Sequence, residues 1–401
     1  MGNNVSENPR EQHPTTPQFV GERVKLGDVV EIEKAPDPSG SKVWLLNLDA
    51  IERDTGNVLE KNMVKPDSVS TSTVAFTENA ILYSTLRPNL NKVVVADEPG
   101  FATSEMLPLV TKSEILDRRY LAYLLRSKSF VNLAVSSTAG AKMPRLSKKT
   151  LLEAVFTIPD LKTQYQRVRL LASIEKAREK TGLQVVRLDS LVKSRFVEMF
   201  GDPVDGAIWT MQQLANLYEV KSSKRIYARE QTKRGVPFLR LADVGSLIDS
   251  GMADSGLFIS EERFEELKAK GQVPAPDDVL VTARGTLGRC YMIKSADRFY
   301  FQDGMITWLA AGENSPLPSY LLAIFDNPHF IEQLNNNCSG TTVKYLSISD
   351  LANVAVPVPP LALQQEFASF VSQVDKSRFI ARQQIEKLQM LYDKLAQDYF
   401  G

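Results

Sequence analysis

Two stretches decide how this chain is built: RLDSLVKSRFVEMFG at residues 187–201 and KLQMLYDKLAQDYFG at residues 387–401. Both are rich in alternating apolar and charged residues, both end in Phe-Gly, and they lie 200 residues apart. Apolar side chains in each stretch recur at intervals of about four and three residues, the spacing of a helix with one apolar face. The sequence therefore predicts the same helix twice.

The repeat extends well beyond these two stretches. Sliding the sequence against itself by 200 positions gives a long ungapped match, in which Gln164 meets Gln364 and Leu188 meets Leu388. Upstream, residues 79–93 resemble residues 277–291 with a small shift in register. A repeat of this length indicates one structural unit used twice.

Each repeat is predicted to end in a long helix that starts after a proline-marked stop and ends at a glycine. A helix of about 37 residues at about 1.5 Å per residue is about 55 Å long. Because both apolar seams are long and in matching register, we expect the two helices to pair as an antiparallel coiled coil. The predicted seam residues are Leu171, Ile174, Val185, Leu188, Val192, Phe367, Val371, Val374, Ile385, Leu388, Tyr392 and Leu395.

The rest of each repeat is predicted to be globular and α+β. Short Val-, Ile- and Leu-rich runs interrupted by Gly, Pro, Asn and Asp favour a mixed sheet, and two amphipathic runs favour helices. The whole chain is then two repeated α+β domains separated by two long helices, with pseudo-two-fold symmetry. The expected boundaries are a disordered tail at 1–17, a first domain at 18–160, helix 161–201, a second domain at 202–360 and helix 361–401.

Composition excludes several classes of protein. With 401 residues, 43% hydrophobic and 24% charged, the chain has the composition of a soluble multidomain protein. No apolar run reaches the roughly 18 residues of a membrane span, so no membrane partner is expected. The two cysteines, Cys290 and Cys338, give no disulfide framework, and a cytoplasmic location is expected.

No motif in the sequence supports catalysis. There is no GxGxxG or Walker loop, so no nucleotide cofactor is expected to bind this chain. With two cysteines and two histidines, a zinc site or any other metal site is not expected either. We therefore predict a protein that is not an enzyme and has no catalytic residues.

Basic loops are the strongest binding signal. Residues 221–240 hold seven cations and one acid, and a second basic loop lies at 140–149. Cations on flexible loops beside rigid strands suit contact with DNA phosphates, although a single basic loop is more often solvated surface. Duplication of such loops favours double-stranded DNA. The candidate DNA-binding residues are Arg87, Lys142, Arg145, Arg225, Arg234, Arg284, Thr286 and Lys344.

On these motifs the chain resembles the specificity (S) subunits of type I restriction-modification systems. The resemblance covers nearly everything after residue 17. It depends most on LVKSRFVEMFGDP, on VPFLRLADV followed by DDVLVTARGTLGR, on GTTVKYLSISDLANVAVPVPPLALQQEF, and on the two-copy layout.

This resemblance implies a function and partners. Each globular domain would be a target-recognition domain that reads half of a bipartite DNA site. Two methyltransferase (M) subunits would bind S-adenosylmethionine and methylate adenine N6, and restriction (R) subunits could join for cleavage and phage defence. The long helices would act as a spacer, and B-DNA rising about 3.4 Å per base pair limits the gap to about sixteen base pairs.

Several alternatives remain open at this stage. The chain could serve a methylation-only or other phage-defence system, because that difference lies in the partner proteins. It could also be a coiled-coil adaptor that does not read DNA, or a single-chain methyltransferase or nuclease with a built-in recognition domain. Salt-dependent DNA binding separates the adaptor, and binding of S-adenosylmethionine by the isolated chain would favour the enzyme.

Overall fold

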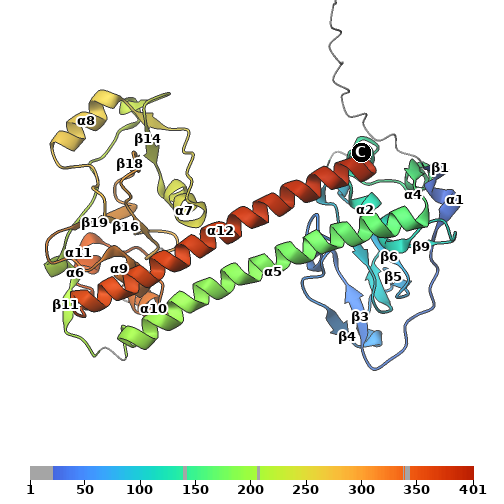
Figure 1. The fold of residues 1–401 in the computed structure, drawn as a ribbon, viewed down its shortest axis with the longest axis horizontal. Helices are drawn as coiled ribbons and strands as arrows, with labels where there is room; N and C mark the ends of the chain where they lie inside the picture. Colours follow the sequence, from blue (N-terminus) through green and yellow to red (C-terminus); the bar gives the residue numbers. More distant parts are fainter. Residues whose placement is uncertain (1–20, 139–141, 206–207, 337, 339–343) are drawn as a thin grey trace, which may run out of the picture. The chain divides into compact units, whose positions relative to one another are not determined.

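The computed structural model describes residues 21–138, 142–205, 208–336, 338 and 344–401. The predicted tail at 1–17 lies outside these residues. The chain divides into two compact units (Figure 1). Unit 1 takes the chain as far as Lys180 together with Gln384–Gly401, and unit 2 takes Thr181–Gln383.

Unit 1 is built on two four-stranded sheets. Strands in the order β2-β9-β6-β7 form the first, and strands in the order β4-β3-β8-β5 form the second. A short antiparallel pair joins β1 to β10, the strand that precedes the first long helix. The strands are β1 (Glu22–Lys25), β2 (Val30–Ile32), β3 (Val43–Leu46), β4 (Asn62–Val64), β5 (Thr73–Phe76), β6 (Ile81–Ser84), β7 (Val93–Val95), β8 (Gly100–Thr103), β9 (Met106–Thr111) and β10 (Val155–Ile158).

Unit 2 repeats this plan. Its sheet in the order β12-β19-β16-β17 corresponds to the first sheet of unit 1, and its sheet in the order β13-β15-β14-β18 carries one parallel pair, as the second sheet of unit 1 does. The strands are β11 (Met211–Gln213), β12 (Tyr218–Lys221), β13 (Gln231–Thr232), β14 (Val236–Leu239), β15 (Phe258–Ile259), β16 (Val279–Thr282), β17 (Cys290–Met292), β18 (Tyr300–Phe301), β19 (Ile306–Ala311) and β20 (Ala355–Pro357). The predicted α+β fold and the internal repeat are confirmed.

Short helices accompany these sheets in both units. Each of the two predicted amphipathic runs is a pair of helices, because Ser127 caps a new helix in unit 1 and Asp326-Asn327 interrupts the run in unit 2. In unit 1 the helices are α1 (Leu26–Val29), η1 (Leu48–Ala50), η2 (Pro66–Ser68), η3 (Pro88–Leu90), α2 (Arg118–Arg126), α3 (Lys128–Ser136) and α4 (Lys148–Glu153). In unit 2 they are α6 (Leu214–Leu217), η4 (Ala228–Glu230), α7 (Leu241–Ser250), α8 (Glu261–Ala269), α9 (Pro318–Phe325), α10 (Pro328–Asn336) and α11 (Ile348–Ala352).

The two long helices are α5 (Leu161–Phe200) and α12 (Leu361–Phe400), each of 40 residues (Figure 1). Gly201 has the left-handed φ of 79° expected after a helix, and its N–H donates to the carbonyl of Val197 at 2.9 Å. In unit 1 the start of α5 packs on the end of α12, since Arg167 donates to the carbonyl of Tyr399 at 3.0 Å. In unit 2 the end of α5 packs on the start of α12, where Arg195 pairs with Glu366 at 2.8 Å. The helices are therefore antiparallel in each unit.

All twelve predicted seam residues are buried or half-buried. Leu171 and Ile174 are buried in unit 1, and Phe367 and Val374 are buried in unit 2. The remaining eight are half-buried: Val185, Leu188, Val192, Val371, Ile385, Leu388, Tyr392 and Leu395. One continuous seam along both helices and the pseudo-two-fold symmetry stay predictions.

The compact units divide the chain differently from the predicted domain boundaries. Each long helix starts in one unit and ends in the other, so its two halves belong to different cores. Phe400 is in the unit 1 core with Tyr120, and Phe200 is in the unit 2 core with Tyr320. Within the described residues, no helix is both long and apolar enough to cross a bilayer.

Candidate nucleic-acid interface

In unit 1 the candidate residues meet at one group of loops, which we call loop cluster 1. It comprises the β6–β7 loop, the turn before β9 and residues 142–146. The N–H of Arg87 donates to the carbonyl of Pro144 at 2.8 Å, and Leu86 bridges to Arg145. Arg87, Lys142 and Arg145 are exposed, so three cations gather on one set of hydrogen-bonded loops.

Unit 2 has an equivalent group, loop cluster 2, made by the β16–β17 loop, the turn before β19 and residues 344–346. The guanidinium of Arg284 lies 5.1 Å from the ring centre of Tyr345. Lys344 and Thr286 are exposed, and the Lys344 ammonium donates to the carbonyl of Asn335 at 2.8 Å. A cation over an aromatic ring and a neighbouring exposed hydroxyl present a polar surface suited to DNA.

The two clusters are closed by the same backbone hydrogen bonds. In unit 1, Thr85 donates to the carbonyl of Glu105 at 2.9 Å and accepts from Leu146 at 3.0 Å. In unit 2, Ala283 donates to the carbonyl of Met305 at 2.9 Å and accepts from Leu346 at 2.9 Å. The loops are therefore held in the same way in both repeats, although their side chains differ.

Arg87 and Arg284 lie at the same turn of the two repeats, one residue out of register. With Thr85 equivalent to Ala283, the equivalent of Arg87 is Gly285, and Arg284 takes the place of Leu86. The backbone agrees, because φ is 49° at Arg87 and 68° at Gly285. An arginine in the left-handed backbone region is uncommon, and this conformation costs more free energy for arginine than for glycine. Because Arg87 and Arg284 are one residue out of register, their side chains leave the two loops at different points.

The remaining two candidates differ in position. Arg225 pairs with Asp303 at 2.8 Å, and this hydrogen bond raises the pKa of its guanidinium. Asp303 lies two residues before Met305, so Arg225 borders loop cluster 2. Arg234 is exposed at the turn between β13 and β14, and no described contact joins it to the cluster.

Opposite charge is scarce at the two clusters. In loop cluster 1, Glu105 pairs with Arg145 at 3.3 Å, and no described carboxylate pairs with Arg87 or Lys142. In loop cluster 2, within the described residues, neither Arg284 nor Lys344 has an ion pair. Such cations remain available to an anionic partner.

Sequence reasoning missed two features of these sites. Tyr345, under Arg284, was signalled only by its position beside Lys344. The glutamine that starts each long helix was noted as a repeat but given no role. Gln364 is buried, accepts from the N–H of Leu317 at 2.8 Å and donates to the carbonyl of Pro359 at 2.8 Å.

Gln164 makes the same contacts in unit 1. It accepts from the N–H of Asp117 at 2.8 Å and donates to the carbonyls of Ile115 and Pro159 at 2.7 and 2.8 Å. In both units the amide fixes the first turn of a long helix to the segment that leads into α2 or α9. It thereby sets the orientation of the globular part on its helix.

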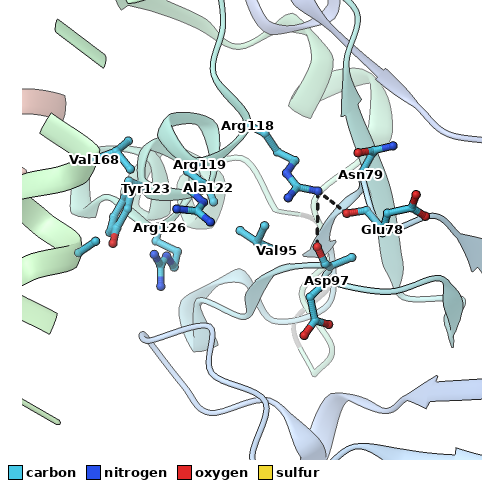
Figure 2. A pocket seen from close by; sticks show the side chains of 12 residues that line it. Glu78, Asn79, Val95, Asp97, Arg118, Arg119, Ala122, Tyr123, Arg126 and Val168 are labelled. Carbon is cyan, nitrogen blue, oxygen red and sulfur yellow. Dashed lines mark hydrogen bonds between the residues drawn. The ribbon is translucent and has the colours of Figure 1, made fainter. Parts of the chain in front are cut away.

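A pocket of about 570 Å³ lies between α2 and α5 in unit 1 (Figure 2). Arg118, Arg119 and Arg126 line it together with the acids Glu78 and Asp97, and Val168 of α5 contributes to its wall. Arg118 donates to the backbone carbonyls of Glu78 and Ala96. Because both arginines and acids line the pocket, its charge favours neither an anionic nor a cationic ligand.

Three side chains could in principle hold a cation. Ligand atoms of Asp202, Asp205 and His329 lie within 4.8 Å of one another in unit 2. Burial alone would raise the pKa of Asp202, but N–H donors from Val204 and Asp205 and the contact with His329 lower it overall. These hydrogen bonds account for the close approach of the three side chains. No other described feature beside them indicates a metal ion.

Comparison with known proteins identifies the family to which the chain belongs. The family model for the type I restriction modification DNA specificity domain matches twice, over residues 21–187 and 208–390. The chain belongs to this family of type I restriction-modification specificity subunits. Members of this family are non-catalytic subunits that supply DNA specificity.

Individual relatives agree with this assignment. The chain is 26% identical over 282 residues to a putative type I restriction enzyme specificity subunit of Haemophilus influenzae, covering 69% of each chain. It is 23% identical to the MjaVIII specificity subunit of Methanocaldococcus jannaschii, covering 97% of this chain and 94% of that one.

Solved structures share the fold. A chain from a structure of a type I R-M system matches with a TM-score of 0.60 at 19% identity, covering 98% of this chain and 99% of that one. The S subunit of a type I system from M. genitalium matches with a TM-score of 0.58 at 16% identity, covering 96% and 97%.

Proposed function

We propose that each unit reads one half of a bipartite DNA site, with loop clusters 1 and 2 on the DNA. The observation that carries this proposal is the repeated loop construction. In each unit it presents two cations, Arg87 and Lys142 or Arg284 and Lys344, that pair with no carboxylate among the described residues. Phosphate contacts by these cations would position the DNA, and neighbouring polar side chains would read base edges, in the major groove.

The expected partners follow from the family. Two M subunits would carry S-adenosylmethionine and flip the target adenines out of the DNA stack, and R subunits would add cleavage. No cofactor is expected on this chain, and the complex would work in the cytoplasm. Exposed apolar side chains on the long helices suit protein docking. In unit 2 these include Leu183 (53%), Val186 (59%), Phe379 (61%) and Ile380 (64%).

Mapping methylation tests the proposal directly. The chain is co-expressed with its M subunit in a host that lacks DNA methylation, and N6-methyladenine is mapped by long-read sequencing. A motif with two defined halves and a fixed gap is expected. A soluble complex that leaves the DNA unmethylated would favour the adaptor alternative.

Salt-dependent binding tests the loop clusters. Affinity of the S–M complex for a duplex of unrelated sequence is measured over a range of salt concentrations with Arg87→Ala and Lys344→Ala variants. Loss of one phosphate contact should lower the slope of log affinity against log salt by about one. Lys270→Ala is the matched control, because Lys270 is exposed at the C-cap of α8 and pairs with Glu266. Equal slopes for all variants would remove these residues from the interface.

A methylation-only system is the closest alternative, and it differs only in the absence of an R subunit. It predicts the same methylation motif without cleavage of unmethylated DNA.

A further inference from the structure

The end of each long helix docks on the globular part of the unit where the other long helix begins. We call the end of α12 in unit 1 helix-end site 1, and the end of α5 in unit 2 helix-end site 2. The two sites share one contact: the ring of Phe400 lies 5.2 Å from that of Tyr120, and the ring of Phe200 lies 4.8 Å from that of Tyr320. Because the repeat relates position n to n + 200, these pairs are equivalent.

Around this shared contact, the apolar packing differs. At helix-end site 2, the ring of Phe196 lies 5.7 Å from that of Phe367 and 5.2 Å from that of Phe200. The repeat places Ala396 where Phe196 would be, and Arg167 where Phe367 would be. The aromatic cluster of helix-end site 2, formed by Phe196, Phe200, Phe367 and Tyr320, therefore keeps only two of its four rings at helix-end site 1. There Tyr399 contributes a different ring, 6.3 Å from that of Phe400.

Helix-end site 1 uses polar contacts instead. The guanidinium of Arg167 lies 4.7 Å from the ring centre of Tyr399, whose equivalent in α5 is Met199. Tyr123 donates to Glu175 at 2.5 Å, and Glu175 also interacts with the phenol of Tyr392. Tyr123 and Arg126 lie side by side on α2, facing α5 (Figure 2).

The charges at the two sites are reversed. At helix-end site 2, Lys193 of α5 pairs with Asp326 at 3.1 Å. At helix-end site 1, Asp393 of α12 pairs with Lys128 at 3.4 Å. Lys193 and Asp393 are equivalent in the repeat, and the equivalent of Asp326 is Arg126. If the ends of α5 and α12 exchanged sites, Lys193 would lie near Arg126 and Lys128. Asp393 would lie near Asp326.

We propose that these differences make the two helix-end sites non-interchangeable, so that α5 pairs with α12 of its own chain and rejects α5 of a second copy. A duplicated chain carries its own competitor, because α5 against α5 of another copy would preserve the shared Phe–Tyr contact. That pairing would lose the aromatic cluster and set like charges together. This inference does not depend on DNA reading.

The test uses the full chain and two variants. In the mismatched variant, Lys193→Asp and Asp393→Lys place like charges at both sites within the chain and opposite charges between copies. In the rematched variant, Asp326→Lys and Lys128→Asp are added, which restores opposite charges within the chain. Self-association is measured by analytical ultracentrifugation over a range of protein concentrations.

The original chain and the rematched variant should sediment as monomers over the same range of concentrations. The mismatched variant should self-associate about tenfold more tightly, since exposed ion pairs contribute modestly but several change sign together. Equal self-association of the mismatched variant and the original chain would overturn the proposal. So would a rematched variant that associates as strongly as the mismatched one.

A thermal unfolding cycle gives a second measurement in case the mismatched variant folds poorly. Lys193→Asp alone should lower the unfolding midpoint of unit 2, and Asp326→Lys should partly restore it. Independent, additive effects of the two substitutions would mean that the charges do not recognise each other.

Discussion

Replacing Gln364 by leucine should destabilise unit 2 out of proportion to the small change in shape. The leucine fills nearly the same volume, but it leaves the N–H of Leu317 and the carbonyl of Pro359 without the partners described above. Gln364 is 3% exposed, so water cannot easily replace them. Each buried backbone group left without a partner costs about 1–3 kcal/mol, so the two groups together cost about 2–6 kcal/mol.

The assay is urea unfolding combined with hydrogen exchange, which reports on each unit separately. The amide of Leu317 should lose protection first, because its acceptor is the substituted side chain. Gln164→Leu should cost unit 1 still more, since Gln164 satisfies three backbone groups. Gln365→Leu is the matched control on the exposed side of the same turn, and it should change stability by less than about 0.5 kcal/mol. A Gln364→Leu variant as stable as this control would refute the reasoning.

Three further predictions concern other parts of the chain. Phe200→Ala should destabilise unit 2 by about 3–5 kcal/mol and leave the amides of unit 1 protected, as followed by hydrogen exchange. Inserting seven residues at the middle of both α5 and α12 adds about 10 Å, so the gap in the methylation motif should lengthen by about three base pairs with both halves unchanged; an unchanged gap would contradict a spacer role. Burial raises the pKa of Tyr392 from 10.0 to about 12, with a further contribution from Glu175. The stability that comes from keeping the Tyr392 phenol neutral in the folded state is complete below pH 10 and is lost as the pH rises towards 12. The Tyr392→Phe variant should therefore lose less unit 1 stability at alkaline pH, as measured by unfolding over a series of pH values.

The repeat and the long helices could be predicted because they depend on local, periodic signals. Identical residues at a fixed separation and an unbroken apolar spacing need no knowledge of distant contacts. The boundary between strand and helix within residues 236–244 depends on a weaker signal. The strand ends at Leu239, and α7 begins after Arg240, whose N–H donates to the carboxylate of Asp243 at 2.7 Å. The acid three residues after the helix start was the available signal.

The binding loops were predicted only in part. Charge and position in loops identified cations that the fold gathers into two clusters, but not their exact register. Arg87 and Arg284 lie one residue apart at the equivalent turn, because the hydrogen bonds that close each loop set the backbone. Ser84 bonds to Lys92 in one loop and Thr282 bonds to Arg289 in the other, so the first loop is one residue longer. The bonds of Thr85 and Ala283 to segments distant in sequence hold each loop in its register, and no local pattern encodes them.

The division of the chain has a consequence for how the protein is made. Unit 2 is continuous in sequence, whereas unit 1 needs residues 384–401, which the ribosome adds only after all of unit 2. Unit 2 can thus fold during synthesis, while unit 1 waits for Phe400 to complete its core. A nascent chain released early would expose the apolar surface that Phe400 covers. The order of synthesis therefore makes completion of the unit 1 core depend on translation of residues 384–401.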